Sequence, residues 1–150
     1  MAVYDRNTKV YRAGLIPILI NQEDFEQSKM MFMIPSANTE FCGIEPQIAK
    51  GQIEEDEEPQ EAALREANEE LGLRIDNIEE IYNCGVWMGR THIFVACVAS
   101  DDPSCFDVPQ FETEQTVWLT IDEFNKQGRQ LHIPVVNSVF DLIYATHFCK

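Results

Sequence analysis

The chain has 150 residues, 45% of them hydrophobic, which is enough for one domain with an ordinary core. Its 26 acidic and 11 basic residues give a formal net charge of −15, and a field of that sign repels the phosphate backbone of long nucleic acids. No apolar run reaches the roughly eighteen residues of a membrane-spanning helix, and the polar first residues lack the apolar centre of a signal peptide. We therefore expect a single domain over residues 1–150 in the cytoplasm, without a membrane or a long nucleic acid as partner. The sequence leaves monomer and homodimer open.

The cysteines and histidines do not indicate a metal or disulfide site. The five cysteines form no C-x-x-C pair, and the three histidines, His92, His132 and His147, show no metal-ligand spacing. We expect reduced, structural thiols, and histidines that pack in the core or lie on the surface.

The first third of the chain predicts a hairpin followed by a loop. Residues 11–20, YRAGLIPILI, form an apolar run typical of a strand covered on both faces, although Pro17 indicates an edge position or a bulge. A polar stretch leads to a second strand at residues 29–34. Residues 35–51 mix turn formers with isolated apolar residues, so we expect a loop with one short strand.

The clearest helix comes next. Pro59 suits its first turn, and Gly72 follows the last periodic apolar residue as a natural C-terminal stop. At about 100° per residue, an acidic arc lies beside an apolar arc on this helix. The acidic arc holds Glu66, Glu69 and Glu70, and the apolar arc holds Ala63, Leu64, Ala67 and Leu71.

The remaining elements are a second hairpin, a strand and two helices. Residues 78–87 and 91–99 are rich in β-branched and aromatic residues and are separated by a short turn. Residues 116–121 predict a further strand, with a helix starting near Asp122. Residues 133–149 predict a core helix. Its apolar face holds Val136, Phe140 and Ile143, with Val135, Val139 and Leu142 alongside.

Residues 51–73, GQIEEDEEPQEAALREANEELGL, carry a motif. Its fixed letters are Gly51, Glu57, Arg65, Glu66, Glu69, Glu70 and Gly72, with Leu73 at its end. This spacing resembles the complete Nudix box, G-x5-E-x7-R-E-U-x-E-E-x-G-U, in which U is a bulky aliphatic residue. All seven fixed letters match, and the one departure is Ala67, which is smaller than the usual aliphatic residue.

The resemblance implies a fold and a reaction. Members of the Nudix hydrolase family have an α/β/α sandwich around a mixed β-sheet, so we expect an α/β protein of this type. They hydrolyse a nucleoside diphosphate linked to another moiety, using magnesium or manganese. The order of elements outside the box is also similar to that of the family.

The crowded carboxylates have a physical reason. Two carboxylates about 5 Å apart repel by roughly 3 kcal/mol at an effective dielectric of about 20, and a bound divalent cation reverses that sign. Mg²⁺ prefers oxygen ligands in octahedral geometry and keeps several waters, so carboxylates plus a substrate phosphate form its usual site. The sequence therefore predicts Mg²⁺ as the cofactor, with Mn²⁺ as the alternative.

The resemblance also assigns roles to residues. Glu66 and Glu70 are implied as the principal metal ligands, with Glu69 joining them or serving a second ion. Gly51 and the carbonyl of Lys50 would close the metal site from the loop. Arg65 is implied as the residue that orients the catalytic carboxylates by forking to Glu66 or Glu57.

The general base and the substrate contacts lie outside the box. Relatives often take the base from a loop near the later strands, where this chain offers Glu112 and Glu114, with Glu66 or Glu69 as further alternatives. Candidates for contact with the substrate are bases on the early strands and aromatic residues near the second hairpin. They are Arg12, Lys50 and Arg90 for phosphates, and Trp87 and Tyr82 for stacking on a ring.

We therefore expect a metal-dependent hydrolase that cleaves the pyrophosphate bond of a nucleoside diphosphate-linked small molecule and releases a nucleoside monophosphate. ADP-ribose, FAD and diadenosine polyphosphates are the candidate substrates. An RNA 5′-end pyrophosphohydrolase and a nucleoside triphosphate pool cleaner remain alternatives. From another class, the chain could be a sensor with the Nudix fold that binds a nucleotide without cleaving it.

Overall fold

A computed structural model describes residues 10–36, 44–110 and 113–148 of the chain. Its strands are β1 (Arg12–Leu19), β2 (Lys29–Pro35), β3 (Ala49–Gln52), β4 (Ile78–Trp87), β5 (Thr91–Val98) and β6 (Thr113–Leu119). Its α-helices are α1 (Pro59–Leu71), α2 (Ile121–Gln127) and α3 (Ile133–Phe148), and the 3-10 turn η4 (Gln130–His132) precedes α3. The predicted hairpins, helices and short third strand are confirmed.

The strands form one mixed sheet. Its order is β4-β5-β1-β2-β6, and β3 also pairs with β1. The neighbours β1 and β5 run parallel, whereas the other pairs are antiparallel. The predicted mixed sheet is therefore confirmed, with β1 at its centre.

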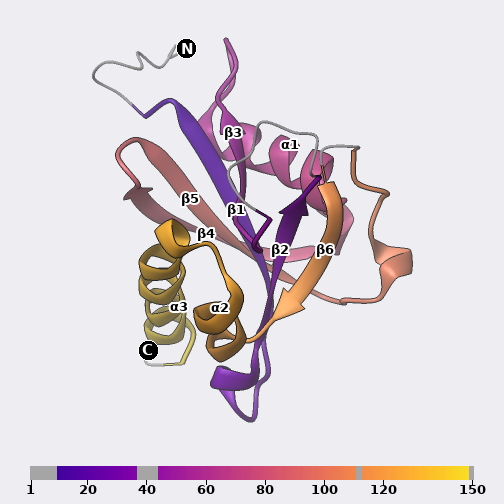
Figure 1. The fold of residues 1–150 in the computed structure, drawn as a ribbon, viewed down its shortest axis with the longest axis vertical. Coiled ribbons are helices and arrows are strands. Elements are labelled where there is room, and N and C mark those ends of the chain that lie inside the picture. Colours follow the sequence, from indigo (N-terminus) through magenta and orange to yellow (C-terminus); the bar gives the residue numbers. More distant parts are fainter. Residues whose placement is uncertain (1–9, 37–43, 111–112, 149–150) are drawn as a thin grey trace.

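Helices cover both faces of the sheet, as in the predicted α/β/α sandwich (Figure 1). On one face, the small buried residues Ala62, Ala63 and Ala67 of α1 pack against β1 and β5. On the other face, α2 and α3 pack on the sheet through a second core that includes Phe124 and Phe140. The protein thus has two apolar layers with the sheet between them.

Pro17 does not lie at an edge of the sheet, so that prediction is wrong. On one side it pairs with Ala96 of β5. On the opposite side, β1 pairs with β3 through Arg12 to Leu15 and with β2 through Ile18 and Leu19. Pro17 therefore lies between the part of β1 that pairs with β3 and the part that pairs with β2.

The ends of α1 follow the predicted signals. The helix begins at Pro59, and Glu58 and Glu61 form a reciprocal capping box around it. Gly72 ends the helix in the left-handed region at φ 76°, where a residue without Cβ is favoured. These local signals set where α1 begins and ends, and so they place Glu66, Glu69 and Glu70 in its second half.

One residue of α3 departs from its predicted face. Val135, Val136, Val139, Phe140 and Ile143 are buried, but Leu142 is 43% exposed. The buried stripe of α3 is therefore narrower than the sequence predicts.

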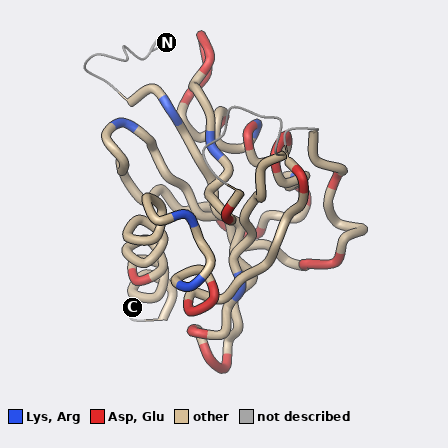
Figure 2. Tube along the Cα trace, viewed as in Figure 1, with Lys and Arg blue, Asp and Glu red and all other residues tan. Residues whose placement is uncertain are grey.

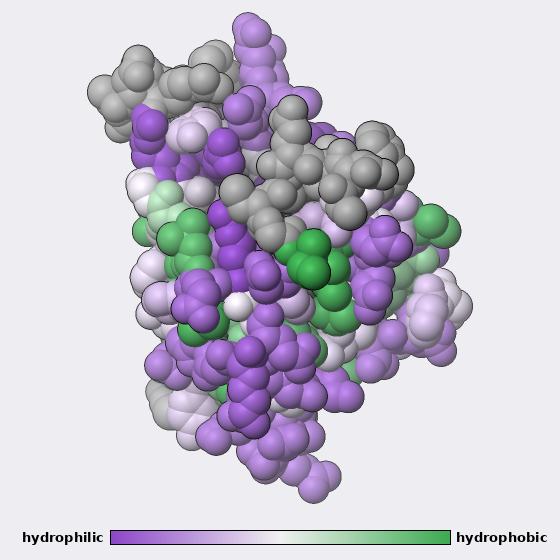
Figure 3. Space-filling view, in the orientation of Figure 1, coloured by the Kyte–Doolittle hydropathy of each residue, from purple (hydrophilic) through white to green (hydrophobic). Residues whose placement is uncertain are grey.

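The visible surface is mainly hydrophilic. Hydrophobic residues appear there in small separate groups (Figure 3). No helix in the described part of the chain is both long enough and apolar enough to cross a bilayer.

Candidate active site

The acidic arc of α1 is held against the sheet by its alanines. Ala62, Ala63 and Ala67 have no exposed surface, and their small side chains let the helix approach β1 and β3 closely. The same packing turns Glu66 and Glu70 toward β3. Burial of these alanines thus fixes the positions of the Glu66 and Glu70 carboxylates.

Glu66 and Glu70 meet at β3. The backbone N–H of Lys50 donates to Oε1 of Glu70 at 3.2 Å, and Glu70 is only 5% exposed. The Glu66 carboxylate lies against Gly51, in the space that a Cβ at that position would occupy. Interaction with Glu70 is one of the influences on the pKa of Glu66, so the two carboxyl groups lie close together. A glycine in the strand therefore makes room for a carboxylate from the helix.

Arg65 holds the carboxylates from the side. Its guanidinium donates to both oxygens of Glu57 at 2.7 and 3.1 Å, and to Oε2 of Glu66 at 2.9 Å. It also reaches Oε2 of Glu69 at 3.4 Å and the carbonyl of Gln52 at 3.0 Å. One side chain thus connects the loop before α1 to the acidic arc, in the fork that the motif predicts.

The pKa values of Glu57 and Glu66, which both accept from Arg65, shift in opposite directions. The hydrogen bonds from Arg65 hold the pKa of Glu57 below its usual value. Burial raises the pKa of Glu66, the charge of Glu69 adds to that rise, and Arg65 opposes it. Burial thus makes the negative charge of Glu66 less favourable than in water, although Arg65 pairs with it.

We expect Glu66→Gln to stabilise the metal-free protein more at neutral than at acid pH. Because the folded-state pKa of Glu66 is raised, its contribution to the free energy of unfolding is present below the unfolded-state pKa and is lost as pH rises through the folded-state pKa. Because glutamine does not ionise, the Glu66→Gln variant is not destabilised in this way as the pH rises. Urea denaturation in EDTA at about pH 4 and about pH 7.5 measures the difference in the free energy of unfolding between the variant and the wild type.

Exposed Glu55→Gln is the matched control for that experiment, since it removes an acid from the same segment without touching the site. Its difference from the wild type measures the effect of removing an exposed acid of the same segment at both pH values. A pH-independent difference for Glu66→Gln would contradict the assignment of a charged, desolvated Glu66.

The donors fit a hard divalent cation. Within residues 10–36, 44–110 and 113–148, no three His, Cys, Asp or Glu side chains are grouped closely enough to hold a metal ion by themselves. Glu66 and Glu70 do meet, and both supply oxygen donors beside the backbone at Lys50 and Gly51. Oxygen donors of this kind suit Mg²⁺ or Mn²⁺. Glu69 is instead turned toward Arg65.

The segment before β6 is tied to the end of α1. The Thr113 hydroxyl donates to the carbonyl of Glu70 at 2.8 Å, and the N–H of Gln110 donates to the carbonyl of Glu69 at 2.8 Å. Glu114 is exposed and lies at a register shift between β2 and β6. Glu112 lies outside the described residues. The structure therefore brings the flanks of both candidate bases next to the acidic arc.

A basic pocket gathers the three predicted phosphate contacts. Arg12, Lys50 and Arg90 line a pocket of about 300 Å³ together with Arg129 and Tyr11. Basic residues at the start of β1, on β3 and at the β4-β5 turn lie on the same side of the molecule (Figure 2). Sequence reasoning missed Arg129, because it lies in a connection without a motif.

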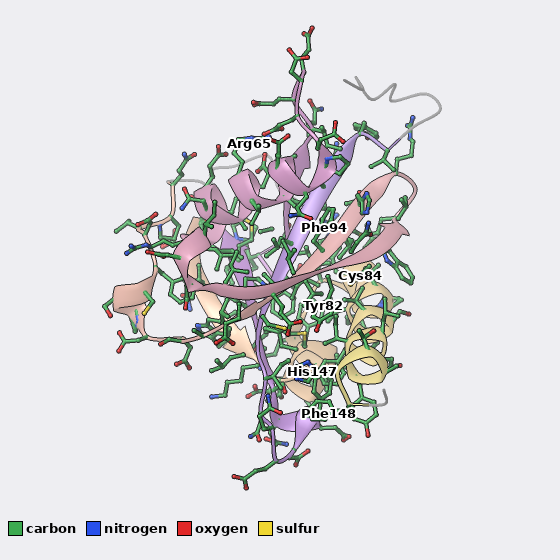
Figure 4. All side chains as sticks on the ribbon, turned by 180° about the vertical axis from the view of Figure 1, so that it is seen from behind. Arg65, Tyr82, Cys84, Phe94, His147 and Phe148 are labelled. Atoms are coloured by element: carbon green, nitrogen blue, oxygen red, sulfur yellow. The ribbon has the colours of Figure 1, made fainter. Side chains whose placement is uncertain are left out.

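The predicted stacking residues lie elsewhere. Trp87 packs against the core beneath α3, and its indole N–H donates to the carbonyl of Cys84 at 2.8 Å. Tyr82 packs on the same core and donates to Glu80 at 3.2 Å. Figure 4 shows Tyr82 near α3, well away from Arg65 on α1. Both aromatic residues thus contact the core, neither lines the basic pocket, and their stacking on a substrate ring stays a prediction.

His132 supports the strand that carries Lys50. It has no exposed surface, and its Nδ1 accepts the N–H of Ile48 at 3.1 Å. Burial first, and then the charges of Arg129 and Lys50, lower its pKa to about 3. His132 is thus a neutral packing residue, as predicted, and it anchors the end of β3.

Comparison with solved structures gives one fold. The Nudix hydrolase RenU from M. smegmatis superposes with a TM-score of 0.69 at 16% identity, covering 94% of each chain. A C. elegans Ap4A hydrolase in a binary complex gives 0.66 at 16% identity, covering 91% of this chain and 98% of the other. The NUDIX domain of Shewanella oneidensis NrtR, crystallised with ADP ribose, gives 0.64 at 13% identity, covering 93% and 94%.

Sequence comparison identifies the family. No curated protein gives a significant match to this sequence. The profile of the NUDIX domain, in contrast, matches residues 15–139, which is most of the chain and includes the whole motif at residues 51–73. With the matching fold, this shows that the chain belongs to the Nudix hydrolases and is an enzyme of the pyrophosphohydrolase type.

Proposed function

We propose that this enzyme hydrolyses the pyrophosphate bond of nucleoside diphosphate-linked small molecules, such as ADP-ribose, FAD or diadenosine polyphosphates, within a single domain over residues 1–150. The observation that carries the proposal is the meeting of Glu66 and Glu70 at Gly51, braced by Arg65. The likeness in fold to an Ap4A hydrolase and to an ADP ribose-bound NUDIX domain is consistent with it.

Glu66 and Glu70 would hold Mg²⁺, or alternatively Mn²⁺, with the backbone at Lys50 and Gly51 beside them. Such an ion neutralises phosphate charge and lowers the pKa of a bound water. Arg65 is a positioning residue, because its hydrogen bonds fix Glu66 and Glu69 and neutralise part of their charge. Glu69 remains a candidate for a second ion.

The reaction adds water across the P–O–P bridge. One P–O bond forms to the water oxygen, the bridging P–O bond breaks, and a nucleoside monophosphate leaves with the second phosphate-terminated product. A general base takes the proton of the water. Glu112 and Glu114 are the proposed candidates, because the residue between them is bonded to Glu70. Glu66 and Glu69 remain the alternatives to them.

A substrate panel in oxygen-18 water with magnesium tests the proposal. We expect turnover of at least one nucleoside diphosphate conjugate, with the label in one phosphate product. Capped RNA and nucleoside triphosphates belong in the same panel, because preferred turnover of either would replace the proposed substrate class. Tight binding of intact ADP-ribose without any product would identify a sensor instead.

A further inference from the structure

The basic pocket concentrates positive charge in a strongly acidic protein. Arg12, Lys50, Arg90 and Arg129 are four of the eleven basic residues in a chain of net charge −15. The described residues that line the pocket include no aspartate or glutamate. A local concentration of one sign, against the sign of the whole molecule, focuses anions into a small volume.

These cations are held close together although they repel. The guanidinium carbons of Arg12 and Arg90 lie 5.2 and 4.8 Å from the centre of the same Tyr11 ring, which attracts both cations. The backbone N–H groups of Tyr11 and Arg12 both donate to the carbonyl of Arg90 at 3.2 Å. Arg12 at the start of β1 and Arg90 in the β4-β5 turn are thus both held against Tyr11 in the pocket wall.

The other two cations are fixed by a different part of the chain. The N–H of Arg129 donates to the carbonyl of Pro46 at 2.9 Å, and the nearby His132 accepts the N–H of Ile48. These bonds dock the connection before α3 onto the segment that leads into β3, so that Arg129 lies beside Lys50 in the pocket.

One polar atom in the pocket wall lacks a partner. Within the described part of the chain, the buried Nε of Arg12 has no hydrogen-bond acceptor. Buried donors are nearly always paired, so this atom is available to an acceptor from outside the described residues. An anion in the pocket would supply that acceptor and also reverse the repulsion among the cations.

The pocket adjoins the carboxylates but lies on the other face of β3. Lys50 and Gly51 are consecutive strand residues, whose side chains point to opposite faces. Gly51 faces Glu66, whereas the Lys50 side chain lines the pocket. A chain of phosphates anchored at Glu66 and Glu70 must pass β3 to reach the pocket. An anion in the pocket would therefore lie on the opposite face of β3 from a phosphate held at Glu66 and Glu70.

We propose that the basic pocket binds the additional phosphates of a polyphosphate chain, so that the enzyme prefers nucleotides with three or more consecutive phosphates over diphosphates such as ADP-ribose. This inference rests on the proposed hydrolysis at Glu66 and Glu70. It assigns the choice of substrate to Arg12, Arg90 and Arg129, which lie outside the Nudix box.

Diadenosine compounds with two to five phosphates test the preference directly. We expect kcat/KM of the wild type to rise about tenfold or more between the diphosphate and the tetraphosphate, because the added phosphates gain charge-assisted hydrogen bonds in the pocket. Arg129→Gln should lower kcat/KM for the tetraphosphate about tenfold more than for the diphosphate. Lys126→Gln is the matched control, because Lys126 pairs with Asp122 on exposed α2 and loses the same charge.

Equal kcat/KM for all chain lengths, or an equal loss on both substrates in Arg129→Gln, would overturn the inference while leaving the proposed hydrolysis intact. Binding in EDTA separates the two proposals further. Calorimetry should show tripolyphosphate binding at least about tenfold more tightly than pyrophosphate, and Arg129→Gln should remove that difference. If no compound is hydrolysed, the proposed function fails, and this binding difference alone decides for or against the pocket.

Discussion

Glu70→Gln is expected to lower kcat/KM for the preferred substrate by about 1,000-fold, a barrier increase of about 4 kcal/mol. Glu70 is 5% exposed and lies beside Glu66, so it supplies one of two carboxylate oxygen donor groups at the centre of the proposed metal site. The amide of glutamine can still accept the N–H of Lys50, which keeps the helix in place on β3. Steady-state kinetics with magnesium in excess measures the loss.

Thermal unfolding separates loss of metal from loss of fold in this variant. A bound ion at about 100 times its Kd stabilises the native state by about 2.7 kcal/mol, so magnesium should raise the Tm of the wild type. The Tm of Glu70→Gln should barely respond, although its Tm in EDTA should match or exceed that of the wild type. Glu55→Gln, an exposed acid of the same segment, should keep both activity and magnesium response. Full activity of Glu70→Gln would contradict the proposed role.

The site was predictable where its determinants are local. Arg65, Glu66, Glu69 and Glu70 occur within six residues, and their directions follow from the helical period alone. The ends of α1 were predictable for the same reason, because Pro59 and Gly72 act on the residues next to them. One turn of helix therefore carries most of the information about the reaction.

Contacts between distant segments were not predictable in this way. Pro17 was assigned to an edge because no sequence pattern shows that β1 exchanges β3 for β2 along one side. The bond from Thr113 to Glu70 joins residues 43 apart in the chain. Arg129 enters the basic pocket only through the docking of its connection onto Pro46. Such positions depend on packing across the sheet, and packing leaves no periodic signal.

The two charge clusters have a common physical basis. Glu66 and Glu70 lie on one face of β3, and Lys50 and Arg129 lie on the other, so each face offers a site for a ligand of opposite charge. A divalent cation and a polyphosphate satisfy both at once. The metal and the polyphosphate carry opposite charges. Binding of one should therefore increase the affinity for the other.

Gly51→Ala is expected to lower kcat/KM about 100-fold with little change in stability. A Cβ at residue 51 would overlap the Glu66 carboxylate, which lies at the end of a flexible side chain and can move aside. The fold tolerates that movement, but a displacement of about 1 Å at a catalytic group costs about 100-fold in rate. Kinetics together with urea denaturation in EDTA measure the two effects separately.

Two comparisons make the Gly51→Ala prediction specific to Glu66. Gly14→Ala should instead lower the free energy of unfolding, because its Cβ would meet the backbone oxygen of Ala49 at 2.9 Å, which cannot move aside. Adding Gly51→Ala to Glu66→Gln should cost little further activity, since both changes remove the same carboxylate from the site. If the two losses instead multiply, Gly51 acts through some other group. In that case the contact between Gly51 and Glu66 does not explain the loss of activity in Gly51→Ala.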